Sequence, residues 1–177
     1  MAAPSTQILS LPGPMLSRGF WLYVWRVQTP KGEKHYVGRT GDNSSPYASP
    51  AYIRMGQHLG RAKNTNALRQ YLENAQIDPE DCSYEMIAHG PIYDEVHNGF
   101  DYSDSNTKAA LFEKHKPLRD DVAAMEKQLC DDLRAAGYFV FNDVNSKAQL
   151  NPKSWLPVRM AFTEEFPLLS RGSRGKQ

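Results

Sequence analysis

Segment 20–27, FWLYVWRV, limits the possible folds of this chain more than any other part of its sequence. It is aromatic and β-branched, and a turn at 29–33 (TPKGE) separates it from a second strand-like stretch, 34–38 (KHYVG). Such stretches favour strands, and a short turn between two of them favours a β-hairpin. The hairpin would bring Tyr23 and Tyr36 close together, either facing a common cleft or as ordinary cross-strand packing.

The remaining pattern adds helices and one further strand. Apolar spacing predicts helices over 51–60 and 66–74, a strand over 83–92, and a long helix over 107–136 that Pro117 could interrupt. Segment 138–141 (YFVF) predicts a short strand or a buried extended stretch. Together these elements predict an α+β domain in which a small mixed or antiparallel three-stranded sheet is flanked by helices.

The chain has 177 residues, which suits one domain with tails. We interpret 1–18, rich in Pro, Ser and Gly, as a flexible N-terminal arm and 19–145 as the domain. The C-terminal extension, 146–177, is expected to be partly disordered, above all in its last residues, SRGSRGKQ. No apolar run approaches the roughly 20 residues needed to cross a bilayer. Two cysteines without a CxxC pair predict neither a disulfide framework nor a zinc knuckle, and a cytoplasmic location is the default.

The formal net charge of +1 conceals an uneven distribution. Residues 18–69 contain nine basic and two acidic side chains, whereas 70–145 contain sixteen acidic and six basic ones. The last segment, 146–177, is basic again. An N-terminal third this basic is suited to face phosphate groups, although a solvated surface would have the same composition.

Three later parts of the chain contain residues that could carry chemistry. Arg54 and His58 are four residues apart on one helix face, and a guanidinium beside an imidazole suits a phosphate as well as an exposed helix pair. Glu126 lies at the edge of the apolar stripe of the long helix, formed by Leu118, Val122, Met125, Leu129 and Leu133. A carboxylate at a core margin needs a partner, which a divalent cation or an arginine would provide. Asn142 and Asn145 follow the helix and either return to the same cleft or serve turns.

The order of these motifs resembles the GIY-YIG nuclease family. Segment 21–23 (WLY) stands where the first triplet belongs, and 36–38 (YVG) matches the second. Arg54 and His58 match the helical Arg and the His one turn later, while Glu126 and then Asn142, with Asn145 in reserve, match the late Glu and Asn. Trp21 replaces the first glycine, the stretch before Arg54 is long, and 93–106 resembles an insertion.

The resemblance implies an enzyme that hydrolyses DNA phosphodiester bonds with one divalent metal, Mg²⁺ or Mn²⁺, on Glu126. Tyr23 would be the general base, Tyr36 would orient the water, and Arg54 would grip the scissile phosphate. His58 would bond to the phosphate or to the Tyr23 hydroxyl, and Asn142 would support the site. Contacts to DNA are expected from the basic residues Lys34, Arg39, Arg61, Lys63 and Arg69.

The sequence leaves other functions open. The same fold could bind DNA without cutting it, or the chain could be a metal-free interaction protein in which the tyrosines are packing and Glu126 is salt-bridged. Within the family, the short extension after Asn145 favours a stand-alone enzyme of the restriction type, either a monomer or a homodimer.

Overall fold

The computed structural model describes residues 5–62, 66–96 and 105–174. Its centre is a three-stranded antiparallel sheet with the strand order β2-β1-β3, built from β1 (Phe20–Thr29), β2 (Gly32–Arg39) and β3 (Ser83–Tyr93). The predicted hairpin and α+β class are therefore confirmed. β1 is the central strand and is buried along most of its length, which explains why its sequence is a continuous apolar run rather than an alternating one.

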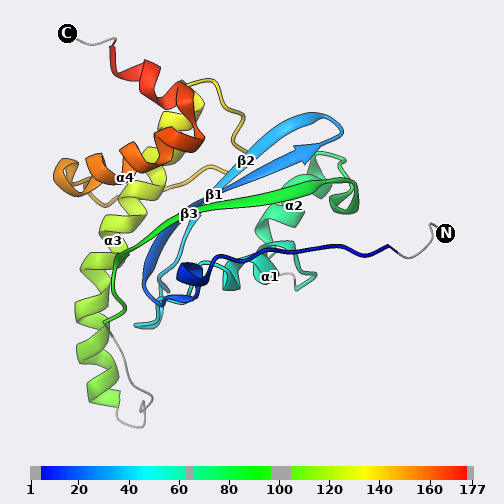
Figure 1. Ribbon diagram of the computed structural model, residues 1–177. Helices are drawn as coiled ribbons and strands as arrows, with labels where there is room; N and C mark the ends of the chain where they lie inside the picture. Colours follow the sequence, from blue (N-terminus) through cyan, green and yellow to red (C-terminus); the bar gives the residue numbers. More distant parts are fainter. Residues whose placement is uncertain (1–4, 63–65, 97–104, 175–177) are drawn as a thin grey trace.

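Helices cover both faces of the sheet (Figure 1). α1 (Ile53–Leu59) and α2 (Ala67–Asn74) lie on one face, and α3 (Ser105–Ala135) and α4 (Pro152–Glu165) lie on the other. Because successive side chains of a strand point to opposite faces, β1 and β2 contribute to two separate cores. The core facing α2 contains Tyr23, Trp25, Val27, Tyr36, Leu68 and Leu72; the core facing α3 contains Leu22, Val24, Val37, Met125, Leu129 and Leu133.

α3 carries Met125, Leu129 and Leu133 of the predicted apolar stripe into the second core, whereas Leu118 and Val122 pack in a smaller cluster with Phe20. The helix continues through Pro117 without ending there. Its C-terminal end leads to segment 139–141, which runs parallel to β2 on the side that β1 leaves open. His35 N donates to Phe139 O at 2.8 Å, and Phe141 N donates to His35 O at 2.8 Å. Segment 138–141 is thus a short extended stretch that covers the outer edge of β2.

The C-terminal extension contains a helix that the sequence analysis does not predict. α4 contributes Trp155, Val158 and Phe162 to the core against α3. Pro152 occupies the first turn of α4, where a missing N–H costs no hydrogen bond, so a proline that resembles a loop signal instead begins a helix. Short 3-10 helices lie at Gly13–Leu16, Pro79–Asp81 and Pro167–Arg174.

Some expectations fall on residues outside the described ranges. Of the segment 170–177, for which the sequence analysis predicts disorder, 170–174 belong to the 3-10 helix Pro167–Arg174 and 175–177 lie outside the description, so the disorder stays a prediction. Most of the predicted insertion, 97–104, is also outside it. None of the described helices combines the length and apolarity needed to cross a bilayer, in agreement with the sequence.

Candidate active site

The second triplet, YVG, places Tyr23 against β2. Tyr23 pairs with Gly38 across the hairpin. A Cβ at position 38 would lie 2.5 Å from atoms of the Tyr23 ring, closer than real Cβ contacts allow. The absence of a side chain at Gly38 therefore lets the phenol of Tyr23 lie across the second strand, pointing toward α1.

His58 joins the two tyrosines. His58 lies on α1, and its Nε2 is 2.7 Å from the Tyr23 hydroxyl in a buried hydrogen bond. The ring of Tyr36 lies 4.9 Å from the His58 ring, measured between centroids. Three side chains predicted for the site, from two strands and one helix, are thus in direct contact.

Burial keeps these three side chains neutral. It raises the pKa of Tyr23 well above the usual value for a phenol, and it raises the pKa of Tyr36 as well. It lowers the pKa of His58 to about 4, with the positive charge of Arg54 acting in the same direction. At neutral pH the cluster is therefore two phenols and an uncharged imidazole, whose Nδ1 is buried without a hydrogen-bond partner in the described part of the chain.

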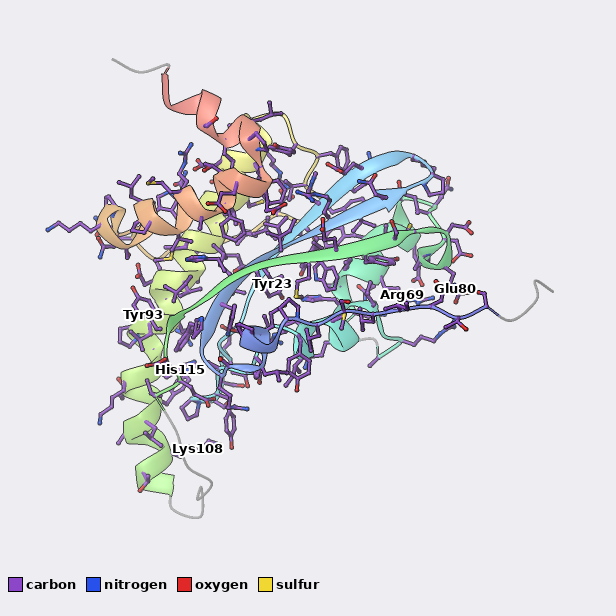
Figure 2. All side chains as sticks on the ribbon, viewed as in Figure 1. Tyr23, Arg69, Glu80, Tyr93, Lys108 and His115 are labelled. Atoms are coloured by element: carbon purple, nitrogen blue, oxygen red, sulfur yellow. The ribbon has the colours of Figure 1, made fainter. Side chains whose placement is uncertain are left out.

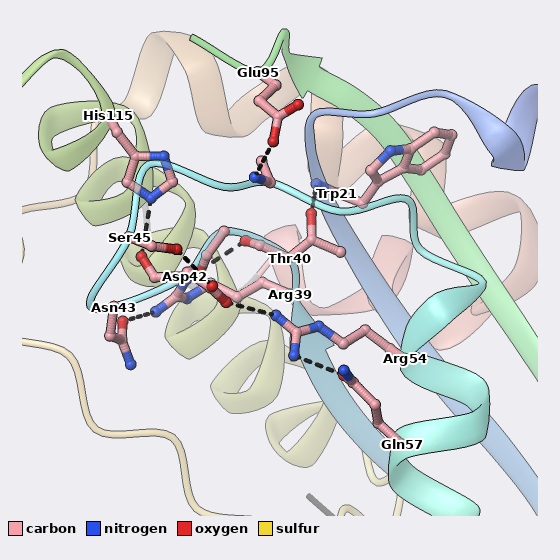
Figure 3. A network of polar contacts seen from close by, with 12 residues as sticks. Trp21, Arg39, Thr40, Asp42, Asn43, Ser45, Arg54, Gln57, Glu95 and His115 are labelled. Atoms are coloured by element: carbon pink, nitrogen blue, oxygen red, sulfur yellow. Dashed lines mark hydrogen bonds and ion pairs between the residues drawn. The ribbon is translucent and has the colours of Figure 1, made fainter. Parts of the chain in front are cut away.

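Arg54 lies one helical turn before His58 and is held by α1 and by the loop that follows β2 (Figure 3). Its Nη1 donates to Gln57 Oε1 at 2.9 Å, and its Nη2 lies 3.7 Å from Asp42 Oδ1. Ser45 donates to the other oxygen of Asp42, and the ring of His115 bonds to the Asp42 carbonyl. These contacts hold the loop in a position where the Asp42 carboxylate faces the Arg54 guanidinium.

Glu126 reaches the end of β2 from α3. Its Oε2 lies 3.2 Å from Arg39 Nε, and both side chains are largely buried. The sequence analysis left either a divalent cation or an arginine as the partner of this carboxylate, and in the structure Arg39 is that arginine. Even so, burial raises the pKa of Glu126 to about 7, and the charges of Arg39 and Arg54 only partly oppose this rise. No group of three or more His, Cys, Asp or Glu side chains within the described ranges could hold a metal ion.

Asn142 supports β2 rather than presenting its amide to a cleft. Its Oδ1 accepts from Val37 N at 3.0 Å, and its Nδ2 donates to Val37 O at 2.8 Å. The side chain thus continues the pairing that 139–141 begin along the outer edge of β2. Val37 lies between Tyr36 and Gly38, so Asn142 holds the strand at the YVG triplet. Asn145 is exposed and lies further away along the chain.

The basic residues predicted to contact DNA differ in their availability. The Lys34 amine lies over the Phe139 ring, and Arg39 faces Glu126 while donating to the carbonyls of the following loop. Arg61 is exposed and pairs with Glu80, whereas Arg69 pairs with Glu73. Figure 2 shows Arg69 and Glu80 on the side of the molecule that carries α2. Lys63 lies outside the described residues.

The sequence analysis does not predict two residues that contact Arg54 in the site. Asp42 and Gln57 hold Arg54, and neither belongs to a matched motif. A signal for Asp42 is present, because it is one of two acidic residues in the basic segment 18–69, which makes a cation near it more frequent. Gln57 is unremarkable in sequence, since only the helix places it beside Arg54.

No protein-family model matches this chain, and comparison with curated proteins and with solved structures found no significant match.

Proposed function

We propose that this protein is a divalent-metal-dependent endonuclease that hydrolyses DNA phosphodiester bonds. The observation that supports this most is the gathering of a phenol, an imidazole, a guanidinium and a carboxylate around the end of β2. The Tyr23 hydroxyl bonds to His58, and the charges of Arg54, Arg39 and Glu126 all act on its pKa. Phosphodiester hydrolysis needs a proton acceptor, neutralisation of phosphate charge and help for the leaving oxygen, and these groups supply each requirement.

Arg54 is the residue that grips the scissile phosphate. Its Nε is buried without a hydrogen-bond partner in the described chain, and its Nη2 faces the Asp42 carboxylate at 3.7 Å without a close hydrogen bond. A phosphate arriving at this guanidinium would gain charge-assisted hydrogen bonds that Asp42 does not provide. While the phosphate replaces Asp42 as the partner of Arg54, the hydrogen bond from Arg54 to Gln57 would keep the guanidinium in place.

Tyr23 and His58 handle the proton of the attacking water. In the tautomer with its hydrogen on Nδ1, neutral His58 accepts the hydrogen bond of the Tyr23 hydroxyl at Nε2. Ionising a phenol at neutral pH is costly, and burial increases that cost here. The charges of Arg54 and Arg39 oppose part of the rise in the pKa of Tyr23, and the hydrogen bond to His58 gives the phenol a base to which it would pass its proton as it receives one from water. Tyr36, against the same imidazole, orients the water.

Glu126 fits the role of metal ligand. Its carboxylate is largely buried, its described ion-pair partner is Arg39, and burial raises its pKa although the charges of Arg39 and Arg54 oppose that rise. Mg²⁺ is commonly held by one or two carboxylates, with water and substrate phosphate as the other ligands, so a single Glu is sufficient. When bound, Mg²⁺ or Mn²⁺ would stabilise the charge on the leaving oxygen.

DNA would bind across the basic N-terminal third and would contact Arg61 and Arg69, which lie beside the C-terminal end of α1. These two residues line a shallow hollow together with Asn66, Gln70 and Glu73. Both Cys82 and Cys130 are free, which is compatible with a reducing cytoplasm. The enzyme would act either as a monomer or as a homodimer.

A second candidate is a domain that binds DNA without cutting it. The ion pair between Arg39 and Glu126 favours this candidate, because a carboxylate satisfied by an arginine has no need of a metal. The two functions differ in one assay. Purified protein with Mg²⁺ or Mn²⁺ is expected to nick supercoiled or branched plasmid, and EDTA is expected to stop the reaction. Salt-sensitive retention of DNA without nicking under any metal would overturn the enzyme in favour of the binding module.

A further inference from the structure

A polar hollow of about 560 Å³ lies beside the candidate site, on the side of the molecule that carries α3. The end of β2, the loop after it, α3 and the segment after Asn142 all contribute to its walls. The residues that line it are mostly polar and include Arg39, Asn43, Arg119, Asp120, Asn145 and Lys147. None of its basic residues except Arg39 belongs to the set predicted from the sequence.

Two residues that line the hollow lie close to Glu126 of the candidate site. Arg39 lines the hollow and also faces Glu126 with its Nε. Ala123, which lines the hollow on α3, precedes Glu126 by three residues, a distance of about 4.5 Å along a helix. An extended ligand that occupies the hollow would therefore also lie close to Glu126.

Besides Arg39, two cations line the hollow: Arg119, which other residues hold in place, and Lys147, which is available to a ligand. Arg119 is held by the Asn43 carbonyl at 3.1 Å and by the carboxylate of Asp120, so its guanidinium has a set position. Lys147 and Asn145 are exposed, and neither side chain has a hydrogen bond or ion pair with the described part of the chain. Three cations against one carboxylate leave this wall positive.

We propose that the hollow binds a backbone phosphate of the DNA strand adjacent to the scissile phosphate, with Lys147 and Asn145 as donors and Arg119 as the fixed charge. This inference rests on the proposed function for its choice of DNA. The positive wall, the free amine and amide, and the position of the hollow next to Glu126 suit a continuous polyanion better than a compact ligand. DNA would then contact both sides of the site, the α1 side at Arg61 and the α3 side at Lys147.

The test is a salt titration of DNA affinity with Lys147→Gln in full-length protein. Binding of a fluorescent duplex is measured by anisotropy in EDTA, so that cleavage cannot contribute. A lost phosphate contact lowers the slope of log affinity against log salt by about 0.9. Lys108→Gln is the matched control, because Lys108 is an exposed lysine on the same helix as Arg119, about 16 Å before it, and Figure 2 shows it near the far end of α3.

The expected result is a reduced slope and weaker binding for Lys147→Gln, with Lys108→Gln unchanged. Equal slopes for the two variants, while the wild-type protein binds DNA, would overturn the subsite and leave the proposed function intact. Failure of the wild-type protein to bind any DNA would instead overturn the proposed function and the subsite together. A deoxynucleoside monophosphate that binds as tightly as the duplex and depends on Lys147 would show a small-anion site and overturn the assignment to DNA.

Discussion

Two buried polar pairs meet at the end of β2, and they respond to burial in opposite ways. On the α1 side, Tyr23 and His58 are bonded and neutral, because burial raises the pKa of the phenol and lowers that of the imidazole. On the α3 side, Glu126 faces the permanent charge of Arg39, yet its pKa still rises to about 7. For Glu126 the cost of burying a charged carboxylate therefore outweighs the opposing charges of Arg39 and Arg54, as it can in a buried ion pair.

The comparison predicts opposite pH effects for one substitution in each pair. The folded state raises the pKa of Glu126 from 4.5 to about 7, so its stabilising effect is complete at low pH and is lost as the pH rises through 7. The folded state lowers the pKa of His58 from 6.5 to about 4, so its effect is complete above pH 6.5 and is lost as the pH falls through 4. Each difference corresponds to about 3 kcal/mol.

Relative to wild type, Glu126→Gln should therefore gain stability from pH 4.5 to 7, and His58→Gln should gain stability from pH 6.5 down to 4. The measurement is the free energy of unfolding in urea at several pH values. Taking differences from wild type removes the contributions of other titrating groups. A Glu126→Gln variant that is less stable than wild type by the same amount at every pH would make the pair with Arg39 a structural ion pair.

A smaller effect tests the strand that separates the two pairs. Asn142→Ala removes both hydrogen bonds to Val37, which lies between Tyr36 and Gly38, and should cost about 2 kcal/mol because the backbone groups of a buried strand lose their partners. Both pairs should be disturbed together, since β2 positions both. Asn145→Ala is the control and should change the free energy of unfolding by less than about 0.5 kcal/mol. Equal effects of the two substitutions would show that Asn142 does not hold the strand.

The sequence predicts the sheet well because local patterns determine it. Segment 20–27 could only be a buried strand, and the turn at 29–33 permits only a hairpin, so the proximity of Tyr23 and Tyr36 follows from chain geometry. The stripe on α3 likewise identifies its buried face. The i to i+4 spacing places Arg54 and His58 on one face of α1, and the helix is present.

Long-range partners are less predictable. That Glu126 meets Arg39, and that Asn142 pairs with Val37 rather than with a ligand, depends on how α3 crosses the sheet. α4 is missed because Pro152 and Pro157 resemble loop signals, although the first lies in the opening turn of a helix whose buried residues fill the core. Local rules cannot weigh that tertiary packing against the prolines.

The central claim is that the Tyr23 hydroxyl takes part in DNA cleavage. Tyr23→Phe keeps the buried ring and removes only the oxygen that bonds to His58. The matched control is Tyr84→Phe, because Tyr84 packs on the same face of the sheet and its hydroxyl donates to the Pro79 carbonyl, away from His58.

The decisive measurement is the rate of plasmid nicking by these two variants with Mg²⁺ or Mn²⁺. Loss of a general base lowers the rate by about 10²- to 10⁴-fold, so Tyr23→Phe should cut at least about 100-fold more slowly than wild type. Tyr84→Phe should cut at the wild-type rate. A Tyr23→Phe protein that nicks plasmid as fast as Tyr84→Phe would contradict the account.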